Sequence, residues 1–297
     1  MLQSLARGGA NIIMLDSNLV ECEKSRNQLL KATAVNPSKV DCQIFDWKSL
    51  SSVYHMTQKI ASSYKNFDRL ILTTPVITSS IVSGEMRMTK DGFEESNAVN
   101  YFSSYVILSE FLKRMKKGDR VVIAVDTEAA IKGEAGLAID EKSRRLIPLD
   151  NMNWQVGFET RAVYNRIHTY LYYISNYFAD KYRNKGVEIL VADPKLTDIT
   201  GAFPSYLSKY FGLSYISSSL IWLLPRRTSY TISLCGQIES GSFKVFEKGA
   251  TQFYGGCVKE DPRLYQEYAQ RVLNEVSRKW TDVRKQNLRM YKNQDSF

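Results

Sequence analysis

The chain has 297 residues, of which 44% are hydrophobic and 24% charged, and this composition is typical of a globular α/β domain and excludes a disordered chain. Its net charge of +9 is spread along the sequence with no nucleic-acid-binding module, so no nucleic-acid partner is expected. Four scattered cysteines and two histidines offer no metal-ligand spacing, which predicts no metal site and reduced thiols in an intracellular protein.

The first sixteen residues have the pattern of the second half of a nucleotide-binding unit. A short helix end stops at Gly8-Gly9, an apolar strand follows over residues 12–15, and Asp16 closes it. In a dinucleotide-binding βαβ unit, an acidic residue here binds the adenosine ribose, and the glycine-rich phosphate loop lies about 20 residues earlier. That loop and the first strand are therefore expected before residue 1, in a longer native chain. Alternatively, Asp16 only forms the turn.

Short apolar strands then alternate with amphipathic helices, which predicts a doubly wound parallel sheet with helices on both faces. Asn18 and Glu21 match a capping box for a helix that runs to about residue 34. A strand over residues 42–45 ends at Asp46. The next helix is marked by one apolar face: Leu50, Val53 and Ile60.

The middle of the chain continues this alternation with longer helices. Residues 70–72 and 121–125 are predicted as buried strands, with a helix over residues 96–116 between them. A second long helix is predicted over residues 158–183, and a strand over residues 188–192 follows it.

The C-terminal third departs from the alternation. Residues 195–228 have the pattern of a lid or an inserted helical pair, and Asp261 with Pro262 starts a C-terminal helix. Residues 286–297 form a polar tail. Because no repeat or linker is found, residues 1–285 are predicted to form a single domain.

Residues 89–94 (Thr-Lys-Asp-Gly-Phe-Glu), followed by Ala98-Val99-Asn100, resemble the short-chain dehydrogenases/reductases, particularly the retinol-dehydrogenase-like branch. The resemblance extends over nearly the whole chain, since Tyr164, Asp193-Pro194 and the Ser240-Gly241 turn follow in the family's order and spacing. It implies a Rossmann-like fold. It also implies hydride transfer between NAD or NADP and a hydrophobic alcohol or carbonyl, such as a retinoid or steroid.

The resemblance implies a catalytic set that this chain carries only in part. Asn100 and Tyr164 stand at the family's asparagine and tyrosine, but His168 replaces the lysine and Asp126, beside Thr127, replaces the serine. A lysine cation lowers the pKa of the phenol, whereas a neutral imidazole does not and a carboxylate raises it. Asp126 could instead pair with His168 and keep it protonated, and Thr127 could supply the hydroxyl.

The cofactor side implied by the resemblance comprises four positions. Asp16 meets the ribose and favours NAD over NADP, because a carboxylate repels the 2′-phosphate. Asp46 stands at the adenine edge, unless it caps the following helix. Thr73 lies in the Leu72-Thr73-Thr74-Pro75 turn, which replaces the family's asparagine-rich turn, and Pro194 follows the sixth strand.

Residues 203–227 occupy the place of the family's substrate lid. Their apolar side chains suit a hydrophobic small molecule, and Arg226 with Arg227 would suit an anionic membrane surface. A helical pair that packs its own apolar stripe against the sheet is the alternative. The sequence therefore favours a cytoplasmic or membrane-associated oxidoreductase. The alternative is a catalytically inactive pseudoenzyme that binds a ligand, lipid or protein, and oligomerisation stays open in both cases.

Overall fold

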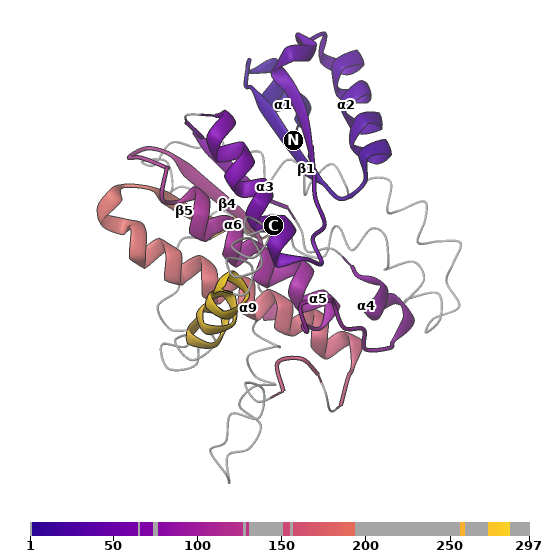
Figure 1. Cartoon of the computed structure of the whole chain (residues 1–297). Helices are drawn as coiled ribbons and strands as arrows, with labels where there is room; N and C mark the ends of the chain where they lie inside the picture. Colours follow the sequence, from indigo (N-terminus) through magenta and orange to yellow (C-terminus); the bar gives the residue numbers. More distant parts are fainter. Residues whose placement is uncertain are drawn as a thin grey trace, which may run out of the picture.

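A computed structural model of the chain describes residues 2–64, 66–73, 77–126, 129–130, 151–154, 157–193, 256–258 and 273–285 (Figure 1). Several predicted features lie outside these ranges: Thr127, Pro194, the Ser240-Gly241 turn, the lid over residues 195–228, the helix start at Asp261 and the tail over residues 286–297.

The described elements confirm the predicted α/β class. In the N-terminal unit, β1 (Ile12–Asp16) pairs in parallel with β2 (Val40–Ile44), so that Ile12 lies opposite Val40 and Asp16 opposite Ile44. Helices α1 (Leu2–Arg7) and α2 (Leu19–Thr33) pack on this pair, and a 3-10 turn (Pro37–Lys39) leads into β2. A small apolar cluster holds the unit together: Ala6, Ile12, Leu29 and Val40.

Asn18 caps α2 as predicted, because its Oδ1 accepts the N–H groups of Val20 at 2.9 Å and Glu21 at 3.3 Å. The reciprocal half of the predicted capping box is made by a different residue. Asp16 Oδ1 accepts the Asn18 N–H at 3.0 Å, while Glu21 pairs with Lys24 on the helix surface. The aspartate that ends β1 therefore also fixes the start of α2.

Cys22 and Cys42 form a disulfide, so the prediction of reduced, unpaired cysteines was wrong for these two residues. Twenty residues separate them in the sequence. Helix α2 packs on β2, and this packing brings the two Cα atoms to 6.2 Å, within the range that a disulfide spans. Sequence spacing alone gave no sign of the pair, since a helix and a strand supply one cysteine each.

The second sheet has the order β3 (Arg69–Leu72), β4 (Arg120–Ala124), β5 (Glu188–Asp193), β6 (Gly256–Val258). The first three strands are parallel, whereas β6 pairs antiparallel with β5, which departs from the purely parallel prediction. An antiparallel edge strand is common on otherwise parallel sheets. Every residue of β4 is buried, as expected for a central strand, but Arg69 of β3 is exposed and only Leu72 of that strand is fully buried.

Helices α3 (Leu50–Ser63), α6 (Ser103–Phe111) and α9 (Thr160–Tyr182) lie alongside this sheet (Figure 1). The helix predicted over residues 96–116 is divided: it starts as α5 (Glu95–Asn97), passes through a π-helical turn η2 (Ala98–Phe102) and continues as α6. It ends at Phe111, earlier than predicted, because residues 112–118 already turn toward β4. Helix α9 agrees with its prediction within two residues at each end.

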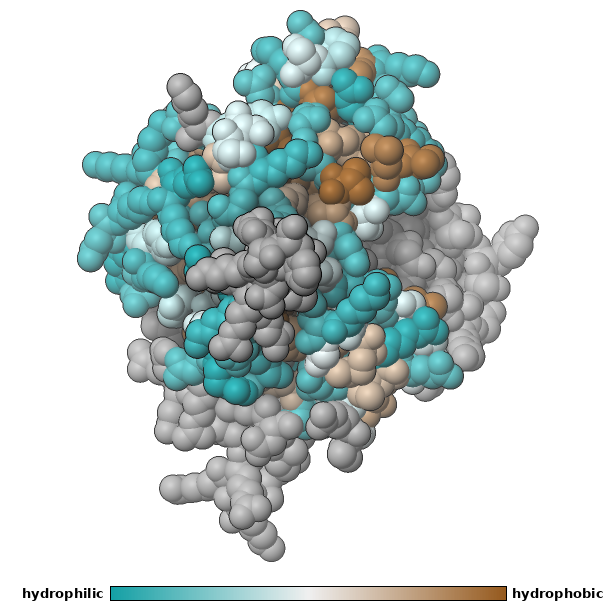
Figure 2. Space-filling model, viewed as in Figure 1, coloured by the Kyte–Doolittle hydropathy of each residue, from teal (hydrophilic) through white to brown (hydrophobic). Residues whose placement is uncertain are grey.

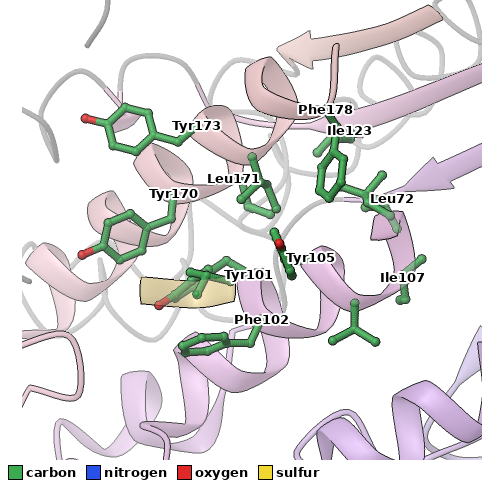
Figure 3. Packing of buried hydrophobic residues seen from close by; sticks show 14 of the residues in the cluster. Leu72, Tyr101, Phe102, Tyr105, Ile107, Ile123, Tyr170, Leu171, Tyr173 and Phe178 are labelled. Atoms are coloured by element: carbon green, nitrogen blue, oxygen red, sulfur yellow. The ribbon is translucent and has the colours of Figure 1, made fainter. Parts of the chain in front are cut away.

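The main core is rich in aromatic side chains from η2, α6 and α9 (Figure 3). Tyr101 stacks on Phe102 with ring centroids 4.4 Å apart and meets Tyr170 of α9 at 4.8 Å. A short helix α4 (Ser79–Ser83) and the helical residues 273–285 pack around it, and Trp280 lies 5.5 Å from the ring of Tyr54. Among the helices of the described ranges, none has the length and apolarity that crossing a membrane requires.

Candidate functional site

Asp16 and Asp46 lie next to each other at the carboxyl ends of β1 and β2. The Phe45 N–H donates to the Asp16 carbonyl at 3.1 Å, which fixes the two strand ends side by side. Asp16 Oδ1 accepts the N–H groups of Ser17 at 2.7 Å and Asn18 at 3.0 Å. Within the described part of the chain Oδ2 has no hydrogen-bond donor, so this oxygen is available to a ligand hydroxyl.

Asp46 forms its own turn and does not cap the next helix. Its Oδ1 accepts the Lys48 N–H at 2.9 Å, and its backbone N–H donates to Ser52 Oγ at 2.9 Å. Ser49 stands directly before the first residue of α3 and accepts the Ser52 N–H at 3.3 Å. The helix-cap alternative for Asp46 was therefore wrong, because the cap position belongs to Ser49. The Asp46 side chain is exposed.

The segment that carried the family resemblance connects this strand end to α5. Asp91 Oδ2 accepts the Leu50 N–H at 2.6 Å, and burial raises the pKa of Asp91. Glu95 forms an ion pair with Lys48. Glu94 is fully buried and caps α5, since it accepts the N–H groups of Ser96 and Asn97, each at 2.9 Å. These three carboxylates were not among the predicted site residues. Asp91 and Glu94 accept backbone N–H groups, and Glu95 pairs with a lysine side chain.

Tyr164 and His168 lie on one face of α9, one turn apart, with ring centroids separated by 4.5 Å. His168 Nδ1 accepts the backbone N–H of Asp126, just after β4, at 3.0 Å. The structure thus brings together three of the five predicted catalytic residues at the end of a central strand. Their catalytic role stays a prediction.

His168 is neutral in this arrangement. Its side chain is 1% exposed, and this burial lowers its pKa from 6.5 to about 3. Since Nδ1 accepts a hydrogen bond, the single proton resides on Nε2, which is buried and has no hydrogen-bond partner among the described residues. His168 therefore supplies no positive field of the kind that a lysine at this position would supply.

The Asp126 carboxylate does not hold His168 protonated, so that hypothesis was wrong. Asp126 Oδ1 accepts the Ala129 N–H at 3.0 Å and stabilises the turn after β4. The group that meets the imidazole is the backbone N–H, which requires an unprotonated Nδ1. Thr169 forms a second hydrogen bond between α9 and this turn, since its Oγ1 donates to the Ala130 carbonyl at 2.8 Å. Nothing in the sequence pattern indicated these two hydrogen bonds between α9 and the turn after β4.

Asn100 lies in the π-helical turn η2, where its Nδ2 donates to the Ser96 carbonyl at 2.9 Å. Single π turns inside helices are frequent at functional sites. Thr73 directly follows β3 and is exposed. Because β3 and β4 are parallel, Thr73 and Asp126 share the carboxyl edge of the second sheet. Within the described ranges, no group of three or more His, Cys, Asp or Glu side chains could hold a metal ion.

No family model matches the chain, and no curated protein matches it. Several solved structures are similar to the chain. An uncharacterised protein from Mycobacterium paratuberculosis is 18% identical, with 94% of this chain and 87% of that chain covered and a TM-score of 0.62. Pseudomonas aeruginosa RhlG in an active-site complex with NADP is 13% identical, with 78% and 82% covered and a TM-score of 0.50. A double mutant of a Serratia marcescens short-chain dehydrogenase/reductase is 17% identical, with 76% and 85% covered and a TM-score of 0.47.

At these identities the first two likenesses show the fold alone. Together with the described sheets and helices, they define a Rossmann-like α/β protein, so the resemblance stated from the sequence is supported at the level of the fold.

Proposed function

We propose that the protein binds the adenosine part of NAD or NADP at the ends of β1 and β2, and that it does not transfer hydride through Tyr164. The second half of this proposal depends on one observation, the neutral and buried His168 whose Nδ1 is engaged by the backbone of Asp126. A phenol needs a nearby cation or another activating group to act as a base at neutral pH. His168 provides no cation above a pH of about 3.

The residues around Asp16 fit an adenosine ribose. A carboxylate oxygen without a donor can accept a ribose hydroxyl, and the start of α2 holds the other oxygen in place. Leu19, Val20 and Ile44 are exposed large apolar side chains near Asp16 in the sequence or across the strand pair. Figure 2 shows that hydrophobic residues reach the surface of the molecule. A flat, weakly polar adenine ring suits such a surface. The Asp16 charge favours NAD over NADP.

Within the described ranges no glycine-rich turn joins a strand to the helix that follows it, so the fit extends to adenosine and not to the pyrophosphate.

A second candidate is the NAD(P)-linked oxidoreductase that acts on a hydrophobic alcohol or carbonyl. Two observations favour it. Asn100 lies in a π-helical turn, and Tyr164 lies close to the carboxyl edge of the second sheet, where ligands bind in open α/β sheets. In this case a group other than His168 must activate Tyr164.

A titration with NADH, NADPH and ADP-ribose tests the binding proposal, with nucleotide or tryptophan fluorescence as the readout. We expect the wild type to bind NADH more tightly than NADPH. Asp16→Ala should weaken NADH binding about ten- to hundredfold and remove the preference, because a hydrogen bond to a charged group contributes about 1.5–3 kcal/mol.

Asn18→Ala is the matched control, since it removes the cap of α2 but leaves the ribose-facing carboxylate. If Asn18→Ala weakens binding as much as Asp16→Ala does, the effect comes from the helix start and the ribose assignment fails. If the folded wild type binds none of the three ligands, the proposal as a whole is refuted.

A further inference from the structure

A second polar cluster lies on the other side of α9 and comprises Arg166, Trp154, Tyr101 and Tyr170. The guanidinium carbon of Arg166 lies 3.8 Å from the centre of the Trp154 ring. The rings of Tyr101 and Tyr170 are 4.8 Å apart, and both side chains are fully buried. In Figure 3 the hydroxyls of these two tyrosines point to the same side of the core. Arg166 lies roughly 200° around the helix from Tyr164, so this cluster is separate from the candidate catalytic face.

Each residue of the cluster has a buried polar atom without a hydrogen-bond partner in the described part of the chain: Arg166 Nη1, Trp154 Nε1, Tyr101 Oη and Tyr170 Oη. All four groups are hydrogen-bond donors, and one of them carries a positive charge. Buried polar groups in folded proteins are almost always hydrogen-bonded, because an unsatisfied one costs free energy. Four donors of this kind in one cluster indicate a missing acceptor.

The nearby carboxylates are engaged elsewhere. The charges of Glu275 and Glu94 raise the pKa of Tyr101, after the larger effects of burial and of Tyr170. However, Glu94 caps α5, and Glu275 forms an ion pair with Arg278 at 2.6 Å. No described carboxylate forms an ion pair with the Arg166 guanidinium, and burial lowers the pKa of Arg166.

The phenols remain neutral donors at physiological pH. Burial raises the pKa of Tyr170 to about 12 and that of Tyr101 well above its ordinary value. Lys279 adds a second positive charge to this region, since its Nζ lies 5.3 Å from the ring centre of Phe93 and 5.9 Å from that of Phe102. The cluster therefore combines positive charge with neutral hydroxyl and indole donors.

We propose that Arg166, Trp154, Tyr101 and Tyr170 form a binding site for the carboxylate of a small organic acid. A planar guanidinium matches the two oxygens of a carboxylate better than it matches a spherical ion. The contact of the Arg166 guanidinium carbon with the face of the Trp154 ring restricts where this group can lie. The phenols and the indole then supply further donors to the same anion.

Thermal unfolding in increasing formate or acetate tests this site, with chloride exchanged to keep ionic strength constant and with sulfate as the anion that is not a carboxylate. A ligand that binds only the folded state raises the melting temperature with its concentration. We expect this rise for formate and acetate in the wild type and its loss in Arg166→Gln. Tyr170→Phe, which removes one hydroxyl and keeps the ring, should raise the apparent Kd roughly fivefold.

Arg161→Gln is the matched control, because Arg161 is an exposed arginine on the same helix. It should keep the full response. An equal response to sulfate, or a full response in both Arg166→Gln and Tyr170→Phe, would overturn the proposal, and so would the absence of any response in the wild type. If Arg166→Gln does not fold, saturation transfer from the wild-type protein to the formate proton, compared with that from Tyr170→Phe, decides the matter. Saturation transfer that is absent, or that is unchanged in Tyr170→Phe, would overturn the proposal.

Discussion

The two ring nitrogens of His168 explain why it adds no positive charge to the face of α9 that carries Tyr164. Nδ1 is used by the backbone N–H of Asp126, and Nε2 carries the proton in a buried position. A lysine at this position would bring a cation and a long flexible side chain, whereas the imidazole brings a rigid, neutral ring 4.5 Å from the Tyr164 ring. The residue therefore acts as a support for the turn after β4.

This neutrality predicts an acid sensitivity of folding. The native pKa of His168 is about 3, while the unfolded chain takes up a proton on this residue near its ordinary 6.5. Below a pH of about 6.5 the unfolded state binds more protons, so stability falls as the pH drops from there toward 3. The expected contribution is up to about 1.4 kcal/mol per pH unit. Urea unfolding at several pH values measures it.

His168→Gln should flatten this dependence between pH 6.5 and 3. His55→Gln, which changes the exposed histidine on α3, should leave it as in the wild type. An unchanged pH dependence in His168→Gln would mean that His168 is not the buried neutral group described above.

At the scale of elements, the contact between α9 and the turn after β4 depends on side-chain to backbone hydrogen bonds. Thr169→Val keeps the shape of the side chain but removes the hydroxyl that donates to the Ala130 carbonyl at 2.8 Å. Because this hydrogen bond between α9 and the turn is then lost, the free energy of unfolding should fall by about 1 kcal/mol. Chemical denaturation measures this loss.

Thr281→Val is the control, since that exposed hydroxyl only bonds a carbonyl of its own helix, Ser277, at 2.8 Å. It should change stability by less than about 0.5 kcal/mol. Equal, small losses in both variants would show that Thr169 does not hold the turn.

The Cys22–Cys42 disulfide joins α2 to β2 and should stabilise the N-terminal unit. For a closed loop of about 20 residues, the expected contribution is about 3 kcal/mol. A reductant should lower the melting temperature of the wild type, and Cys22→Ala with Cys42→Ala should reproduce that lower value and no longer respond to the reductant. A wild type that melts at the same temperature with and without reductant would contradict the pairing.

For the whole molecule, the sequence was sufficient to predict the α/β class and most elements. The reason is that the alternation of apolar strands and amphipathic helices is a local pattern, as in β4 and α9. The helix cap at Asn18 could also be predicted, because capping involves only neighbouring residues of the sequence. The neutral state of His168, the disulfide and the antiparallel β6 depend on packing between distant segments, which no local pattern reports.

The part of the candidate site at the ends of β1 and β2 matches the expected cofactor binding. The part at the end of β4 does not match the expected hydride-transfer chemistry. At the ends of β1 and β2, Asp16 keeps an oxygen available for a ribose hydroxyl. At the end of β4, the side chains of His168 and Asp126 each accept a backbone N–H group. The proposed function therefore keeps nucleotide binding and omits hydride transfer through Tyr164.

A turnover assay tests this account most directly. The wild type and Tyr164→Phe are mixed with NADH or NADPH and a set of hydrophobic aldehydes and ketones, including retinal and a steroid ketone, and nucleotide oxidation is followed by absorbance. We predict that neither protein oxidises the nucleotide faster than buffer does, even where the fluorescence titration shows that NADH is bound. Oxidation by the wild type that Tyr164→Phe abolishes would contradict the account.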